Sequence, residues 1–195
     1  MIAFGCHKGL YVPQGLGVLY VRQDLSDLQP AYLAVSSLAS PPADLVARAD
    51  NMELRADAGR FEIGNVNIPD IHALAASLVL IERIGVAAIN DHVLDLGDHL
   101  IRKLDELGVR LVGPRARVHR SHIYVLNLPG DGWLEYFASQ NVRVSPERDG
   151  IRVSFGFFNT ADEIDRFIEI VRARNALSSS MITTFDIQPT SYESY

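Results

Sequence analysis

The 195 residues carry a net charge of −6 and are 48% hydrophobic and 22% charged, which is ordinary for a globular chain able to bury a core. The basic residues are scattered and no apolar run approaches the roughly 20 residues that span a bilayer, so we expect neither a nucleic-acid nor a membrane partner. The single cysteine, Cys6, cannot form an internal disulfide, which favours the cytoplasm.

The N-terminal segment has the pattern of two short strands joined by a turn-rich connector. Residues 1–5 are apolar, residues 17–22 (GVLYVR) favour a strand, and residues 8–17 contain three Gly and one Pro. Over 23–59 we expect at most one short strand, within DNMELRADAGRFE. The first two strands are predicted to be the edge of a larger sheet.

Two helices are predicted next. Asn67-Ile-Pro-Asp70 is a typical helix start, the first helix is expected to run from Pro69 to Gly85, and the second is expected to end at Gly108. Apolar residues recur at helical spacing in both: Ile71, Leu74, Ala75, Leu78, Ile81 and Ile84 in the first, and Ile89, Val93, Leu96, Leu100 and Leu104 in the second.

The remaining residues alternate between strand and helix patterns, which predicts a small α/β sandwich, a sheet with helices on one face. Thr160-Ala-Asp-Glu163 has the form of a capping box at the start of the final helix. The sequence ends in a polar segment, 176–195, that we expect to be a flexible tail. The expected strands are 109–112, 122–128, 142–145 and 151–155, and the expected helices are 133–140 and 160–173.

Lys8 is the first candidate for chemistry. Small residues, Gly and Pro surround it just after an apolar strand, and partial desolvation there would favour the neutral amine, a nucleophile toward carbonyl carbon. A solvated loop lysine fits the same pattern.

Other candidate motifs are weaker. Cys6 has the pattern of a small packed thiol. The stretch GLGVLYV opens into a strand, so it does not match a nucleotide-binding loop. The histidines lack metal-binding spacing, so no metal is predicted.

Two further stretches could bind an anion. Arg60-Phe-Glu-Ile-Gly-Asn-Val-Asn67 places Gly64 and Asn65 just before a helix start, where backbone N–H groups can hold a phosphate, although a helix-capping loop without a ligand has the same sequence. Arg152 lies in an apolar strand. We expect it to be buried there, and because a buried arginine is costly unless paired, it must meet either an internal carboxylate or a substrate carboxylate.

Together these stretches resemble the class V aminotransferase family of pyridoxal-phosphate enzymes, which includes cysteine desulfurases and isopenicillin N epimerase-like proteins. HKGLYVPQGLGVLYVR is similar to the family's Schiff-base segment, RFEIGNVN to its R-F-E-x-G-T-x-N stretch, and IRVSFGFFNTADEIDRFI to its carboxylate-binding segment. The resemblance covers Met1 to about Arg174 and the C-terminal half of the family.

The resemblance implies fold type I: 1–68 would be the end of the large-domain sheet, and 69–175 a small C-terminal α/β domain with its linking helix. Lys8 would form the Schiff base with pyridoxal 5'-phosphate, and His7 would lie near the phosphate. Gly64 and Asn65 would contact the phosphate across a subunit interface. Arg152 would bind the α-carboxylate of an amino-acid substrate. These roles match the chemistry of an amine, N–H donors and a guanidinium fork.

Three departures from the family pattern bear on the reaction. Gly5 replaces a Ser common in the family, Asn65 replaces a Thr, and the SPERDG loop lacks the thiol of the desulfurase branch. Persulfide chemistry is therefore disfavoured, whereas transamination, epimerisation and lyase chemistry stay open. The family's N-terminal half supplies the Asp at the pyridine nitrogen, and without it the cofactor ring is a poor electron sink.

Three hypotheses follow. The chain is the C-terminal component or fragment of a split enzyme, a homodimer or a heteromer active only with the missing N-terminal half. Alternatively, it is a non-catalytic α/β domain, a truncated product or accessory subunit that only binds a partner chain. Without the resemblance, there remains an α/β domain that binds an anionic metabolite at Gly64 and Asn65.

Overall fold

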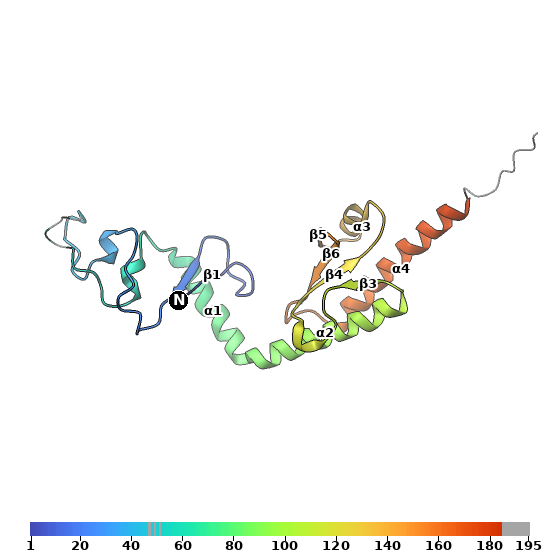
Figure 1. The fold of residues 1–195 in the computed structure, drawn as a ribbon, viewed down its shortest axis with the longest axis horizontal. Coiled ribbons are helices and arrows are strands. Elements are labelled where there is room, and N and C mark those ends of the chain that lie inside the picture. Colours follow the sequence, from blue (N-terminus) through green and yellow to red (C-terminus); the bar gives the residue numbers. More distant parts are fainter. Residues whose placement is uncertain (47, 49, 51, 185–195) are drawn as a thin grey trace, which may run out of the picture. The chain divides into compact units, whose positions relative to one another are not determined.

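The computed structural model describes residues 1–46, 48, 50 and 52–184, which form two units that meet in the sequence between Ile84 and Gly85 (Figure 1). Helix α1 (Ile68–Ile84) ends the first unit, and helix α2 (Val86–Glu106) begins the second. Gly85 separates them with a φ of 91°, a left-handed conformation that favours glycine. Both predicted helices are confirmed to within about two residues.

The first unit begins with a two-stranded antiparallel sheet of β1 (Ile2–Gly5) and β2 (Gly17–Tyr20). As predicted, these strands do not belong to the sheet of the second half. Most of their apolar side chains, including those of Ile2 and Phe4, are exposed. A two-stranded sheet alone is marginally stable in water, so the rest of the unit must hold it.

The segment between β2 and α1 contains two short 3-10 helices, η1 (Val35–Ser37) and η2 (Ala58–Phe61). The short strand expected within DNMELRADAGRFE is reduced to one bridge, in which Leu38 pairs with Leu54. Flanking backbone hydrogen bonds from Ala39 N to Glu53 O and from Arg55 N to Ser37 O complete this contact. Residues 37–39 and 53–55 thus support each other without forming a regular β-ladder.

Helix α1 begins where Asn67 caps it: Asn67 Oδ1 accepts a hydrogen bond from Asp70 N, and Asn67 O accepts one from Ile71 N. Asp70 is the one buried residue of this helix. Within the predicted apolar stripe, Ile71, Leu78 and Ile84 are 39%, 47% and 39% exposed. Together with exposed Val79 and Leu80 they leave α1 with apolar side chains on nearly every side, a pattern typical of fully buried helices.

No single helix among the described residues is long and apolar enough to cross a membrane. Only α1 and α2 taken together, across the break at Gly85, reach the required length and composition.

The second unit is built on a four-stranded antiparallel sheet in the order β3-β4-β6-β5 (Figure 1). The predicted strand at 142–145 is wrong in position, because β5 starts at Ser145 and pairs with β6 across a tight turn. The strands are β3 (Arg110–Val112), β4 (Ile123–Asn127), β5 (Ser145–Glu147) and β6 (Gly150–Ser154), and the helices after α2 are α3 (Trp133–Ser139) and α4 (Ala161–Thr184).

One face of this sheet builds the core of the second unit. Tyr124 and Leu126 of β4 and Ile151 and Val153 of β6 are buried, and they pack with apolar residues of the three helices. Phe137 of α3 stacks on Phe167 of α4 with 5.3 Å between ring centroids. The alternating residues of β4 and β6 point to the other face, which we call the open face and define by Val125, Arg152, Ser154 and the β5 residues Ser145 and Glu147.

Helix α4 begins with the predicted capping box. Thr160 N donates to Glu163 Oε2 at 2.8 Å, and Glu163 N donates to Thr160 Oγ1 at 3.4 Å. The helix runs on to Thr184, past the predicted end at Ala173 and into the segment expected to be a tail, because no Gly or Pro interrupts it. Residues 185–195 of that expected tail lie outside the described residues.

A loop between β3 and β4 is fastened to α2 by ion pairs. Asp98 of α2 accepts hydrogen bonds from Arg117 Nη1 at 2.6 Å and from Arg120 Nη2. The Arg120 side chain is only 4% exposed, whereas Asp98 is 38% exposed. Arg117 also pairs with Asp95 at 2.8 Å, near the solvent. Asp98 is therefore the carboxylate that neutralises the buried guanidinium of Arg120.

Candidate functional site

Lys8 lies at the tip of a turn that directly follows β1. Backbone hydrogen bonds close the turn, from Cys6 N to Leu16 O (3.1 Å), Val12 N to Cys6 O (3.2 Å) and Tyr11 N to Lys8 O (3.0 Å). The Cys6 side chain is buried beneath it, and the Lys8 side chain is exposed. The expected desolvation of Lys8 is therefore not observed, because no described residue covers the turn. Within the described residues, the Lys8 ammonium forms no ion pair.

His7 lies beside Lys8 and folds back toward β1. A Cβ atom at Gly5 would lie 3.1 Å from His7 Nδ1, a contact tighter than most Cβ atoms make. The glycine found at this position thus leaves room for the imidazole ring. A serine here would require His7 to shift, which links the sequence departure at Gly5 to the position of His7.

The turn is held against the start and the middle of α1. Ser77 Oγ donates a 2.6 Å hydrogen bond to Leu10 O, and Gly15 lies near Asp70 and Asn67, whose side-chain atoms are 3.6 Å and 3.7 Å from its Cβ position. The φ of Gly15 is 130°, which other residues rarely adopt. The backbone around Lys8 is therefore fixed by one helix, although its side chain is free in solvent.

Gly64 and Asn65 lie in an exposed bend just before α1. No atom lies within 4 Å of the Cβ position of Gly64, so a ligand can approach its backbone. The helix start itself already holds Asp70, whose Oδ2 accepts a 2.9 Å hydrogen bond from Asn67 Nδ2. An anion therefore has access to the bend rather than to the first turn of the helix. No hydrogen bond or ion pair joins Gly64 or Asn65 to Lys8 in the part of the chain that the structure describes.

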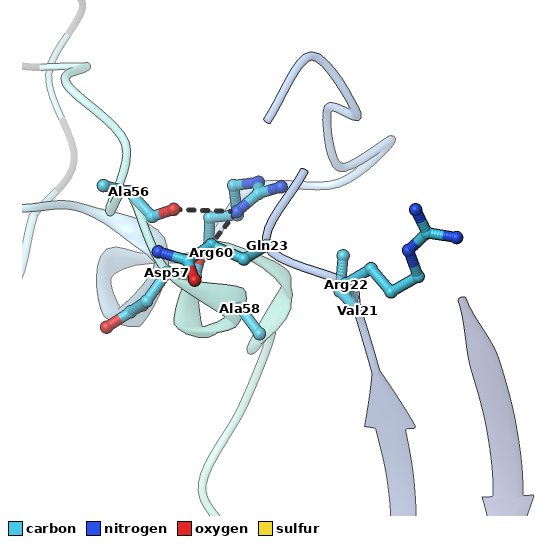
Figure 2. Close-up of a pocket in the computed structure, with 7 residues that line it drawn as sticks. All are labelled: Val21, Arg22, Gln23, Ala56, Asp57, Ala58 and Arg60. Carbon is cyan, nitrogen blue, oxygen red and sulfur yellow. Dashed lines mark hydrogen bonds between the residues drawn. The ribbon is translucent and has the colours of Figure 1, made fainter. Parts of the chain in front are cut away.

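Arg60 fixes the backbone that leads to this bend, a role that the sequence analysis missed. Its guanidinium is buried and donates to four backbone carbonyls. The acceptors are Leu25 O (3.0 Å), Leu28 O (3.1 Å), Ala56 O (3.1 Å) and Asp57 O (2.8 Å). Arg60 lines a pocket of about 360 Å³ together with Arg22 and Gln23 (Figure 2). The RFE motif was the available signal, because an arginine between short loops can bind several carbonyls at once.

Two serines hold Glu62, two residues after Arg60 in the same stretch. Ser36 Oγ and Ser37 Oγ both donate to Glu62 O, at 2.8 Å and 3.0 Å. Ser37 is completely buried. Arg60 and Glu62 are thus held from two directions, so the bend at Gly64 and Asn65 starts from a fixed position.

Arg152 lies on β6 in the second unit and points to the open face of the sheet. Its side chain is 43% exposed, so the buried arginine expected from the sequence is wrong: the strand alternates, and Ile151 and Val153 take the core positions. Arg152 Nη1 donates to Glu147 Oε1 at 3.1 Å. Of the two alternatives for its partner, an internal carboxylate is present in the structure.

The residues described so far are compatible with binding of a pyridoxal-phosphate cofactor. Lys8 offers an accessible amine on a fixed turn, and the bend at Gly64 offers accessible backbone. The residues present fit this group. Cys6 is buried in the turn after β1, and the β5–β6 hairpin carries no cysteine, so neither position offers an accessible thiol. Among the described residues, no cluster of three His, Cys, Asp or Glu could hold a metal ion.

Comparison with known families gives one clear match. The model of the aminotransferase class-V family matches residues 1–138. An uncharacterized protein of Schizosaccharomyces pombe is 36% identical over 90% of this chain, and an uncharacterized aminotransferase of the same yeast is 33% identical over 87%. A probable cysteine desulfurase of Mycobacterium leprae is 30% identical over 87%.

Solved structures agree with this match. The apo cysteine desulfurase of Thermococcus onnurineus is similar with a TM-score of 0.76 and 27% identity over 86% of this chain. A mutant of the cystine C–S lyase C-DES, with glycine covalently linked to its PLP cofactor, has the same fold, with a TM-score of 0.72 and 21% identity. The chain spans 41% and 44% of the two yeast relatives and 45% of the Thermococcus enzyme, and it has the C-terminal part of that α/β fold. The chain belongs to the aminotransferase class-V family.

Proposed function

We propose that the chain is the C-terminal component or fragment of an enzyme that acts on an amino acid with Lys8 as the residue that carries the cofactor. Pyridoxal 5'-phosphate is the cofactor that membership of this family indicates. The observation that carries the proposal is the exposed Lys8 amine on a turn held by three backbone hydrogen bonds and by Ser77 of α1. A fixed backbone with a free amine suits covalent capture of an aldehyde.

The other residues would have binding roles. The bend at Gly64 and Asn65 would donate N–H groups to the cofactor phosphate of a neighbouring subunit, and His7 would lie near that phosphate. Arg152 would bind the substrate α-carboxylate, for which its planar guanidinium provides a bidentate match. The bound cofactor would supply an electron sink, and Lys8 would move the proton at the substrate α-carbon.

The reaction would be transamination, epimerisation or a lyase reaction. Several relatives are named cysteine desulfurases, and a persulfide mechanism needs a thiol near the substrate. The hairpin SPERDG (145–150) has none, and Cys6 is buried, which favours the three thiol-independent reactions.

The enzyme would be a cytoplasmic homodimer or a heteromer completed by residues that correspond to the N-terminal half of the family. The first unit supports this proposal through its surface. Apolar side chains of β1, β2 and α1 are exposed, among them Phe4 (43%), Leu78 (47%) and Val79 (55%). Contiguous apolar surface on a folded protein usually marks an interaction site.

Reductive trapping tests the proposal. The chain has two lysines, so Lys103 is an internal control for Lys8. Lys103 lies on α2 and pairs with Glu106 at 3.7 Å. Pyridoxal 5'-phosphate is added, the imine is reduced with borohydride, and peptide mass spectrometry measures the label at each lysine. We expect Lys8 to be labelled several times more than Lys103.

The same experiment with pyridoxal, which lacks the phosphate, shows whether phosphate binding contributes. Lys8→Arg keeps the charge and removes the reactive amine, so it should lose the label at residue 8 and leave Lys103 unchanged. Equal labelling of the two lysines in the wild-type chain, alone and with an added N-terminal half, would contradict the proposal. That result would instead favour the non-catalytic α/β domain that only binds a partner chain.

A further inference from the structure

The β5–β6 hairpin places a carboxylate beside Arg152 by rigid backbone geometry. Its two strands are joined through Arg148 and Asp149. A Cβ atom at Gly150 would lie 2.1 Å from Leu126 O, so only glycine allows the hairpin to approach β4 this closely. Asn127 Nδ2 of β4 also donates to Asp149 O at 3.3 Å. The hairpin therefore cannot move away from β4 without losing these contacts.

The strand register decides where Glu147 points. Ser145 pairs directly with Arg152, and Glu147, two residues after Ser145, pairs with Gly150, two residues before Arg152. Residues two apart share a face of the sheet, so Glu147 and Arg152 are diagonal neighbours on the open face. This explains the 3.1 Å contact between Glu147 Oε1 and Arg152 Nη1.

The Glu147–Arg152 pair lies where Arg152 can exchange Glu147 for another carboxylate. The Glu147 and Arg152 side chains are 42% and 43% exposed, and ion pairs with this exposure contribute little to stability. The contact uses Nη1 alone, and a guanidinium has five N–H donors, so Arg152 keeps donors for a second carboxylate. Two carboxylates on one guanidinium repel each other, because like charges a few ångströms apart interact unfavourably.

We propose that Glu147 is a specificity-determining residue that competes with the substrate carboxylate for Arg152. Its carboxylate holds the guanidinium when no substrate is bound, and gives way to the α-carboxylate of an amino acid. A substrate with a second carboxylate would place a further negative charge near Glu147. The substrate class is therefore amino acids with a neutral or cationic side chain, and dicarboxylic amino acids are rejected.

This inference rests on the proposed role of Arg152, and a test on the full chain separates the two. The ¹H–¹⁵N signal of Arg152 Nε is assigned by its loss in Arg152→Lys. Sodium acetate and sodium succinate are then titrated into the wild-type chain and Glu147→Gln, with sodium chloride at matched ionic strength as the reference. We expect Glu147→Gln to lower the apparent Kd for acetate by about two- to fivefold, and that for succinate by more.

Asp149→Asn is the matched control, because it removes the same charge from the same hairpin and keeps the backbone carbonyl that Asn127 contacts. Its acetate titration should match that of the wild type. A wild-type Arg152 signal that does not respond to acetate beyond chloride would overturn the proposed carboxylate role of Arg152. A response that is the same in the wild type and Glu147→Gln, or that rises equally in Asp149→Asn, would overturn only the role of Glu147.

Discussion

Gly97 of α2 lies so close to Tyr124 of β4 that a Cβ atom at position 97 would be 1.7 Å from Tyr124 Oη. Helix α2 and the sheet of the second unit are in contact at this point. Gly97 is buried, and Tyr124 belongs to the hydrophobic core. Glycine is costly inside a helix, by roughly 1 kcal/mol relative to alanine. The close approach to Tyr124 is the compensating reason for Gly97.

Gly97→Ala should therefore destabilise the second unit, although alanine favours helix. Overpacking a core usually costs about 1–3 kcal/mol, and here the clash is with an aromatic side chain held by its neighbours. Urea unfolding followed by circular dichroism measures the change. Gly9→Ala is the control, because no atom lies within 4 Å of its Cβ position. Equal stability of Gly97→Ala and the wild type would show that Tyr124 moves freely.

Asp98 should make the second unit sensitive to acid. Partial burial alone would raise the pKa of Asp98, but hydrogen bonds from Arg120 and Arg117 outweigh it and hold the pKa below 3.8. A carboxylate with a lowered pKa stabilises the fold above its unfolded pKa, and the contribution disappears as pH falls through the folded value. Unfolding free energy measured between pH 6 and pH 3 should therefore fall most below about pH 4.

Replacing Asp98 isolates this contribution. Asp98→Asn leaves the buried Arg120 without a carboxylate and should cost about 2 kcal/mol at pH 7, less than for a fully buried pair because Asp98 is partly exposed. It should also flatten the acid dependence. Asp95→Asn is the matched control, since Asp95 is 72% exposed and pairs with Arg117 alone. A variant at Asp98 with wild-type acid dependence would contradict the assignment.

Arg60→Lys should loosen the first unit without changing the second. A lysine keeps the charge, but its single nitrogen cannot reach carbonyls of Leu25, Leu28 and Ala56 at the same time. Unsatisfied buried carbonyls should cost about 2–4 kcal/mol in total. Hydrogen exchange should rise in residues 25–28 and 56–62 and stay unchanged in α2 and β4. Increased exchange in both units would mean that Arg60 supports more than its own unit.

Thr160→Ala should weaken the start of α4 by about 1 kcal/mol, the usual cost of losing an N-cap. The hydrogen bond from the backbone N–H of Thr160 and one from Asn159 lower the pKa of Glu163. This interaction is present above the ordinary glutamate pKa and is lost as pH falls through the lower folded value. The effect of Glu163→Gln, measured by thermal unfolding, should therefore shrink from pH 7 to pH 3. An effect independent of pH would contradict a charge-assisted cap.

The sequence was most informative where local chemistry decides the structure. Asn67 and Thr160 are recognisable caps, and both start helices as predicted. The β5 strand was misplaced because its pairing depends on Gly150 and the approach to β4, contacts that lie far apart in the sequence. Helix α4 ends later than predicted because a polar composition does not by itself end a helix that contains no Gly or Pro.

The candidate site was predictable in part, for a related reason. Motif spacing identified Lys8, Gly64, Asn65 and Arg152, and their roles stay predictions. Exposure could not be predicted from the same motifs. Lys8 is uncovered, and Arg152 points outward because strand alternation gives the core to Ile151 and Val153. The pairing of Arg152 with Glu147 required the hairpin register, which single-residue patterns do not contain.

The apolar surface of α1 also affects how the gene can vary. Exposed positions of a protein usually accept most substitutions, and a mutational scan of the chain by itself would rate Leu78 and Val79 as tolerant. In the proposed complete enzyme the same positions would be as restricted as a core. One mutational scan would measure the growth of cells that depend on the enzyme, and a second would measure the folding of the isolated chain. Comparing the two would thus show positions along α1 that do not tolerate substitution for reasons that the chain's own stability does not explain.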